Sequence, residues 1–319
     1  MLEFRILIFL KRIDFMLDIA LLGTGGMMPM PGRFLSSMII RFNGHLILTD
    51  CGEGTQVSLK NLGWGFKAID AILFTHYHAD HISGLPGMFH AIANAGRTET
   101  LKLVGPKGLA YIVDGLRRIA SELPYAVEYI ELDEELMKGF YFDNLRIKAT
   151  NAVHSVKCVS YRFDVMRKGR FDAKKAIEYN VPKDKWSLLQ KGENVEIDGK
   201  TVFSKDVMGV PRKGISITFA TDTRPFEGIA DFAANSDILI CEGMYGENEK
   251  IPMAKEKKHM TFSEAAQVAK NANAQELWLT HYSPSLTEPE EFIGNATEIF
   301  ENTVAGFDGI TKTLKFESR

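Results

Sequence analysis

The sequence predicts an α/β fold, in which helices cover layered β-sheets. Two observations indicate this class. Short apolar segments of strand length alternate with amphipathic segments of helical length from Met16 to the end of the 319-residue chain. Several of the apolar segments also end abruptly in polar residues, as strands do at the functional edge of an open sheet.

The elements of the first half can be placed in order. Residues 17–22 form a strand that leads into a loop with Gly23, Gly25 and Gly26, which we interpret as a tight turn because the sequence lacks the P-loop lysine. Asn43-Gly44 predicts a hairpin between strands 38–42 and 45–49. After loop 50–54 and a short helix to Leu62, further strands are expected at 71–74, 101–104, 127–132, 145–149 and 159–163, with helices at 82–95 and 108–121.

The composition excludes several classes of protein. The chain is 45% apolar and 25% charged, which excludes collagen, a coiled coil and bulk disorder. It contains no run of about 18 apolar residues, so we expect no membrane-spanning helix. The three cysteines, Cys51, Cys158 and Cys241, are widely spaced and predict reduced, buried thiols of a cytoplasmic protein.

Residues 1–15 form an extension ahead of the domain predicted for 16–319. They are apolar and carry Arg5, Lys11 and Arg12, but the apolar run 6–10 is too short for a signal peptide. The sequence allows translation from an upstream start codon, an added edge strand or dimer contact, or a targeting role.

The segment that begins at Arg162 differs from the rest of the chain in charge. Residues 162–191 carry a formal charge of +5, whereas the other 289 residues sum to −8. The asymmetry predicts either a basic projection for a polyanion or an ordinary solvated helix-turn insertion. After Gly214 the regular pattern returns, with strands expected at 215–220, 237–241 and 276–280 and helices at 261–272 and 288–300.

A cluster of possible metal ligands follows the strand at 71–74. His76, His78, Asp80 and His81 lie within six residues, and imidazole and carboxylate are the ligands that zinc takes in catalytic sites. In an extended backbone, residues two apart point the same way, so we expect His76, His78 and Asp80 to converge and His81 to face a second direction. One histidine alone would indicate a structural role; four ligands indicate a metal site.

Three more candidate ligands stand just after apolar segments elsewhere in the chain. His154 follows the strand at 145–149, Asp222 follows the strand at 215–220, and His281 follows the strand at 276–280. Each one alone is ambiguous. Together they would complete a site for two metal ions.

At this point the chain shows a resemblance to a known family. His76-Tyr77-His78-Ala79-Asp80-His81 resembles the HxHxDH signature of the metallo-β-lactamase superfamily, and narrower motifs are similar to those of ribonuclease Z, the tRNA 3′-processing endonuclease. These motifs are DCGEGTQ at 50–56, PRKG at 211–214, DTRP at 222–225, Glu242, and His259-Met260-Thr261. The resemblance implies a four-layer αββα metallo-β-lactamase sandwich, with residues 162–214 inserted as a basic, tRNA-binding arm.

The resemblance also implies a role for each candidate. His76, His78 and His154 would hold one zinc ion, and Asp80, His81 and His281 the other, with Asp222 bridging the two. Manganese or iron could occupy the same ligands. Asp80 would also orient the attacking nucleophile as proton acceptor, and the Glu242–His259 pair would protonate the leaving oxygen.

The activity implied is that of a zinc-dependent endoribonuclease, which removes the 3′ trailer of precursor tRNA. Attack of a metal-bound hydroxide on the phosphodiester would leave a tRNA 3′-hydroxyl and a trailer 5′-phosphate. The protein would be a cytoplasmic homodimer with no membrane partner, its arm binding tRNA on the partner's site. The alternatives are a phosphodiesterase of the same fold that acts on a small molecule, and a metal-free RNA-binding relative.

Other assignments are less specific. Arm residues Lys183 and Lys185 would contact RNA, as would Arg212 and Lys213. Where family members have a Gly-Pro motif in the arm, Lys183-Asp184-Lys185-Trp186 would supply charge and base stacking instead. Cys241 stands where the family has histidine, so the packing next to Glu242 should differ. The remaining assignments stay open: Asp50 and Glu53 are either metal-site supports or turn residues, and the lysines at 250, 255, 257 and 258 either contact phosphate or face solvent.

Overall fold

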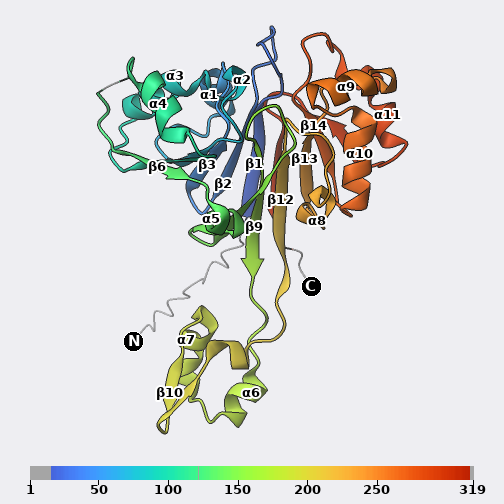
Figure 1. Cartoon of the computed structure of the whole chain (residues 1–319). Helices are drawn as coiled ribbons and strands as arrows, with labels where there is room; N and C mark the ends of the chain where they lie inside the picture. The colour runs from blue at the N-terminus through green and yellow to red at the C-terminus, as the bar shows by residue number, and fades with distance from the viewer. Residues whose placement is uncertain (1–15, 121, 317–319) are drawn as a thin grey trace, which may run out of the picture.

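Two seven-stranded sheets packed face to face form the body of the protein (Figure 1). This computed structural model describes residues 16–120 and 122–316. The extension 1–15 lies outside the described residues, and so does the last residue of the helix predicted at 108–121. Within the described part, no helix is both long and apolar enough to cross a membrane.

The first sheet holds most of the amino-terminal half and one strand from the carboxyl end. Its strands, in spatial order, are β16 (Thr311–Lys315), β1 (Met16–Gly23), β2 (Ser37–Phe42), β3 (His45–Thr49), β4 (Ile69–Leu73), β5 (Leu101–Gly105) and β6 (Val127–Glu131). The predicted β2–β3 hairpin is present, with Asn43 and Gly44 both at positive φ. Strands β3 to β6 run parallel, so their carboxyl ends share one edge.

The second sheet has the same arrangement at that edge. Its strands are β15 (Thr303–Ala305), β14 (Leu277–Thr280), β13 (Ile238–Glu242), β12 (Arg212–Ala220), β9 (Val159–Arg167), β8 (Leu145–Asn151) and β7 (Phe140–Phe142). Strands β12 to β15 run parallel. The carboxyl ends of both sheets therefore meet at the top of the molecule in Figure 1.

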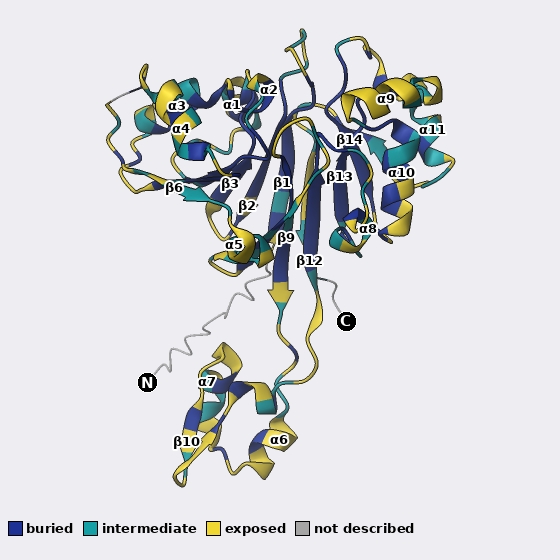
Figure 2. Cartoon of the chain, viewed as in Figure 1, coloured by how far each residue is buried: buried dark blue, intermediate teal, exposed yellow. Residues whose placement is uncertain are grey.

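Three apolar clusters make four layers, as the αββα prediction requires. The central cluster lies between the sheets and includes Ile19, Phe163 and Trp278. A second cluster packs the outer face of the first sheet against α1 (Thr55–Leu62), α3 (Leu85–Asn94) and α4 (Leu109–Arg117). A third packs the other sheet against α8 (Ile229–Phe232), α10 (Phe262–Asn271) and α11 (Gly294–Thr297). Figure 2 shows the buried strands and the exposed outer faces of these helices.

A few elements differ from the sequence prediction. The helix expected at 82–95 is two helices, α2 (Ala79–Ile82) and α3, and the first begins three residues earlier. The helix expected at 288–300 is divided into η4 (Pro289–Phe292) and α11, with Gly294 at the junction. Three further helical elements were not predicted: α5 (Glu134–Lys138), η3 (Asn248–Lys250) and α9 (Ile251–Lys257).

The basic segment forms a separate small unit on two long strands. Strands β9 and β12 pair antiparallel as far as Arg167 and Arg212, and the chain between them projects from the end of the sandwich opposite the shared edge (Figure 1). The unit contains α6 (Ala173–Glu178), η1 (Lys183–Lys185), α7 (Trp186–Lys191), β10 (Val195–Ile197), β11 (Lys200–Val202) and η2 (Ser204–Val207). It has its own apolar cluster around Leu189, Val195 and Val207.

Arg162 lies within the body, although it begins the basic segment. Its guanidinium pairs with Asp164 at 2.8 Å and donates to the carbonyl oxygens of Phe232 and Ala234, both at 2.9 Å. This arginine therefore stabilises the second sheet and its covering helix. The charge of the projecting unit comes from the residues beyond it.

Candidate metal centre

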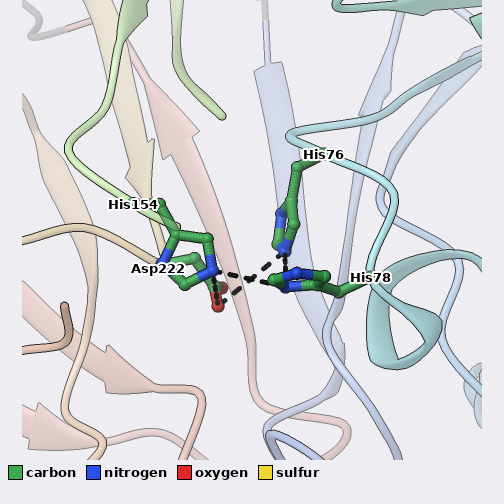
Figure 3. Close-up of side chains that lie close together, drawn as sticks. All are labelled: His76, His78, His154 and Asp222. Carbon is green, nitrogen blue, oxygen red and sulfur yellow. Dashed lines mark hydrogen bonds and ion pairs between the residues drawn. The ribbon is translucent and has the colours of Figure 1, made fainter. Parts of the chain in front are cut away.

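The first group of ligands gathers residues from three separate segments. His76 Nε2 lies 2.9 Å from His78 Nδ1, and His154 Nε2 lies 3.3 Å from the same His78 atom. Asp222 Oδ1 faces this group, 3.7 Å from His154 Nε2 and 4.0 Å from His76 Nε2. Figure 3 shows the three rings and the carboxylate pointing toward one another.

The second group faces the other oxygen of the same aspartate. Asp222 Oδ2 lies 3.0 Å from His81 Nε2 and 3.2 Å from His281 Nε2, and these two nitrogens are 3.2 Å apart. Asp80 Oδ2 completes the group at 3.3 Å from His281 Nε2. All seven ligands predicted from the sequence thus converge, and Asp222 stands between the two groups.

The prediction that Asp80 converges with His76 and His78 is wrong. It assumed an extended backbone through the motif, but the chain turns into helix α2 at Ala79. The helix places Asp80 in the second group, with His81 and His281, although the His81 ring still lies beside that of His76 with centroids 4.2 Å apart. The structure places His76, His78 and His154 in one group and Asp80, His81 and His281 in the other.

The donor set fits two divalent metal ions. Nitrogen ligands held tetrahedrally at about 2.0–2.1 Å from a zinc ion lie about 3.4 Å from each other, close to the separations given above. Asp222 Oδ2 is buried and accepts no hydrogen bond, and the Nδ1 atoms of His154 and His281 are also buried without a hydrogen-bond partner. A buried carboxylate oxygen without a donor is costly unless a cation takes that place.

The electrostatics of the site agree with metal binding. Burial lowers the pKa of His76 and that of His154, so both rings offer a lone pair. Burial also opposes the charged form of His81, but the carboxylates of Asp222 and Asp50 outweigh it and raise the pKa of His81. A metal ion at Nε2 of His81 would displace that proton.

Asp50 holds His81 from the Nδ1 side of its ring. Its Oδ2 lies 2.8 Å from His81 Nδ1, and its Oδ1 accepts the backbone N–H of Thr75 at 2.8 Å. Asp50 therefore fixes the tautomer and direction of His81, one of the two alternatives left open by the sequence. Glu53 is exposed, and its carbonyl accepts the backbone N–H of Leu35.

Backbone turns at strand ends aim several of these side chains. Asp50, Asp222 and His281 each follow a strand and have φ between 53° and 58°. This left-handed conformation is unfavourable for residues with a side chain and is concentrated at functional sites. The turn takes the backbone out of the strand direction. The side chain of the residue at the turn then points across the shared edge of the sheets.

The loop after β1 packs directly against the second group. A Cβ added to Gly26 would come within 2.7 Å of the His281 ring, so only glycine fits there. The next residue, Met27, donates its backbone N–H to Asp80 Oδ2 at 2.7 Å. The glycine-rich turn predicted from the sequence thus lies against two ligands, and the contact made by Met27 was not foreseen.

Glu242 and His259 form the predicted pair beside the centre. Glu242 Oε2 lies 2.9 Å from His259 Nδ1, and its Oε1 accepts the backbone N–H of Thr223. Burial lowers the pKa of His259, but the Glu242 carboxylate outweighs this and raises the pKa to about 9. The His259 ring lies against that of His281, with centroids 5.6 Å apart.

Arg224 holds the backbone of His259, a contact that the sequence motif alone does not reveal. Its guanidinium donates to the carbonyl oxygen of His259 and to both carboxylate oxygens of Glu264. Beside the pair, Cys241 is buried with its Sγ 4.0 Å from Met260 Sδ. This contact occupies the position where the family resemblance implies a histidine.

A cavity of about 260 Å³ opens onto the centre. Its lining includes His78, Asp80, His154, Asp222, His259 and His281 together with Met27 and Lys257. Of the four lysines in the run 250–258, Lys257 lines the cavity, while Lys258 donates its Nζ to the carbonyl oxygen of His154 at 2.9 Å. Lys250 pairs with Glu247 at 2.7 Å.

The predicted RNA contacts of the arm lie far from this cavity. Lys183 and Lys185 are in the projecting unit, and Arg212 begins β12 at the end opposite to Asp222. Lys213 pairs with Asp237 at 3.0 Å. Trp186 is half-buried: its ring packs on Phe171 and its indole N–H donates to the carbonyl oxygen of Val181, so its role in base stacking stays a prediction.

Comparison with known proteins places this chain in a family. A family model described as anti-Pycsar protein Apyc1 matches residues 17–179. Over 306 residues, the chain is 50% identical to a ribonuclease Z of Lachnospira eligens, covering 95% of this chain and 99% of that protein. A ribonuclease Z of Clostridium acetobutylicum is also 50% identical, with 95% of this chain and 100% of that protein covered.

Solved structures share the fold at lower identity. Human tRNase Z, short form, has a TM-score of 0.64 and 22% identity, with 92% of this chain and 98% of that chain covered. The metallo-β-lactamase fold protein YhfI of Bacillus subtilis has a TM-score of 0.67 and 18% identity, covering 94% and 100%. The metallo-β-lactamase sandwich is thereby confirmed. With curated relatives at 50% identity over nearly their full length, the chain belongs to the ribonuclease Z family.

Proposed function

We propose that this protein is a zinc-dependent endoribonuclease that removes the 3′ trailer of precursor tRNA. The observation that carries the proposal is the convergence of seven metal-competent ligands beside the Glu242–His259 pair. The ribonuclease Z relatives match over 95% of the chain, which supports an RNA substrate. The products would be a tRNA with a 3′-hydroxyl and a trailer with a 5′-phosphate.

Two zinc ions would be held by the two groups, one by His76, His78 and His154 and the other by Asp80, His81 and His281, with Asp222 shared between them. When bound, such a pair supplies an activated water at neutral pH and neutralises the charge that develops on the phosphate. Manganese or iron could take the same ligands.

Asp80 would orient the nucleophile and accept its proton. Burial would raise the pKa of Asp80, but the hydrogen bond to His281 and the positive charge of His81 outweigh it and lower the pKa. The Met27 N–H fixes the carboxylate from the other side. Asp80 is thus held ionised and immobile at the cavity wall, as a proton acceptor must be.

His259 would donate a proton to the leaving 3′-oxygen. Its ring is oriented by Glu242, its carbonyl is held by Arg224, and it faces the cavity. Breaking the bond between phosphorus and the 3′-oxygen would leave an alkoxide. A protonated imidazole beside this oxygen would transfer its proton as the bond breaks, so that the unstable alkoxide does not form.

The projecting unit and the strand ends that carry it, within 162–214, would bind the body of the tRNA. The protein would act as a homodimer. The unit leaves the sandwich at the end opposite the metal centre, and β12 alone separates Arg212 from Asp222 by roughly 30 Å. Because the unit points away from its own centre, we propose that Lys183, Lys185, Arg212 and Lys213 contact tRNA bound at the partner's centre. The buried, unpaired cysteines fit a cytoplasmic protein.

The test is to map the ends made from a precursor tRNA. Zinc-loaded protein should cut a 5′-labelled precursor once, after the discriminator nucleotide, and leave a tRNA end that accepts ligation as a 3′-hydroxyl. A chelator should stop the cut and added zinc should restore it. Metal-loaded protein that hydrolyses a small phosphodiester but leaves the precursor intact would favour the small-molecule phosphodiesterase instead.

A further inference from the structure

Met27 is an exposed apolar side chain at the wall of a polar cavity. The residue is 68% exposed, and its neighbour Met28 is 54% exposed. The other apolar residues that line the cavity, Met244 and Tyr245, are 1% and 8% exposed and belong to a small buried cluster. Met27 therefore offers apolar surface where a substrate enters.

The fold gives no structural reason for this side chain. Met27 has a φ of 67°, a conformation that glycine adopts at lower cost than methionine. The conformation is needed because the backbone N–H of Met27 binds Asp80 Oδ2, and glycine would make the same contact. Met27 is absent from each of the buried apolar clusters of the described residues.

The position of Met27 defines what can reach it. Its backbone touches Asp80, and the preceding Gly26 lies against the His281 ring. A phosphate held between the two ligand groups would thus lie within one residue of Met27. In RNA each phosphate is flanked by two bases, which are flat, aromatic and joined to it through one sugar.

We propose that the side chain of Met27 forms an apolar platform for the base of a nucleotide that adjoins the scissile phosphate. Thioethers make favourable contacts with aromatic rings, and a platform of this kind accepts any base because every base has an aromatic face. The proposal rests on the proposed function, since it requires an RNA substrate. It adds a subsite that holds the base while the metal centre holds the phosphate.

The experiment uses the full-length, zinc-loaded protein and a precursor tRNA. Met27→Gly removes the platform and keeps the backbone contact to Asp80, so zinc content and the thermal midpoint should not fall. KM for the precursor should rise about three- to tenfold with little change in kcat. Met27→Leu keeps an apolar surface and should stay within about twofold of the wild type. Met28→Ala, on the neighbour that does not line the cavity, is the matched control and should have no effect.

Substrates with a single abasic nucleotide test the contact itself. Removing the base on one side of the cleavage site should weaken cleavage by the wild-type enzyme and have no further effect on Met27→Gly. The side on which this coupling occurs identifies the base that is bound. Equal losses in both enzymes at both positions, or an equal KM for Met27→Gly and wild type, would refute the platform while leaving the endoribonuclease intact. A wild type that does not cleave the precursor at all would overturn the proposed function and this subsite with it.

Discussion

At the scale of single residues, Asp222 explains how two ligand groups become one centre. Its two oxygens face different groups, and one of them is buried without a hydrogen bond. Burial would raise the pKa of Asp222, but the surrounding histidines, His281 and His81 first among them, outweigh it and lower the pKa. The carboxylate is thus ionised and directed at both groups, which is what a bridging ligand requires.

The Glu242–His259 pair predicts a particular pH dependence. A general acid works in its protonated form, so the rate should hold up to the pKa of His259, about 9, and fall at higher pH. Glu242→Gln removes the negative charge that raises this pKa against the effect of burial. The alkaline limb of the kcat profile should then move down by about one to two pH units.

The measurement is kcat against pH at saturating precursor and zinc for wild type and Glu242→Gln. His259→Asn, which cannot titrate, serves as the control and should lose the alkaline limb together with about 100-fold or more of the rate. An unchanged alkaline limb in Glu242→Gln would show that His259 is not the acid.

At the scale of elements, the centre is assembled by loops at the carboxyl ends of β4, β8, β12 and β14. These strands could be predicted, because each is a short apolar segment followed at once by polar residues, as in 71–74 before Thr75. The direction of Asp80 could not be predicted from alternation, because a helix starts at Ala79. Strand β16 was missed because its pattern, Thr-Lys-Thr-Leu-Lys, is polar and mostly exposed at the sheet edge.

The glycine turn after β1 offers a test of how loops set metal affinity. Gly26→Ala would place a Cβ 2.7 Å from the His281 ring and push this ligand out of position. We expect metal affinity at the second group to fall about 10- to 100-fold. Titration with zinc, followed by calorimetry or a chromophoric chelator, measures the change.

Gly115→Ala is the matched control for this substitution. Gly115 lies in α4 with nothing within 4 Å of an added Cβ, so alanine there should leave metal affinity unchanged and slightly raise stability. Equal zinc affinity in Gly26→Ala and wild type would mean that His281 does not need the position it has against this turn.

At the scale of the whole molecule, the edge with the candidate metal centre and the basic projecting unit lie at opposite ends of one sandwich (Figure 1). Charge alone predicted that the segment after Arg162 differs from the rest. The packing of Trp186 was not predictable, because its ring contacts Phe171 from another segment of the unit and its indole N–H donates to a backbone carbonyl oxygen, that of Val181.

The projecting unit should contribute to RNA binding and not to chemistry. Lys183→Glu combined with Lys185→Glu should weaken binding of precursor tRNA and lower the slope of log affinity against log salt by about 1.5 to 2. Hydrolysis of bis(p-nitrophenyl) phosphate should be unchanged. The control is Lys60→Glu combined with Lys270→Glu, two exposed lysines on helices of the body. A parallel loss on the small substrate would contradict a role confined to binding.

The most direct test of the central claim is single-turnover cleavage of a 5′-labelled precursor tRNA by wild type and by Asp80→Ala, with tRNA binding measured in parallel. Asp80 is held by both Met27 and His281 at the cavity wall, so we predict a loss of cleavage of about 1,000-fold or more with tRNA affinity within about twofold of wild type. Wild-type cleavage by Asp80→Ala would contradict the assignment of this centre as the site of phosphodiester hydrolysis.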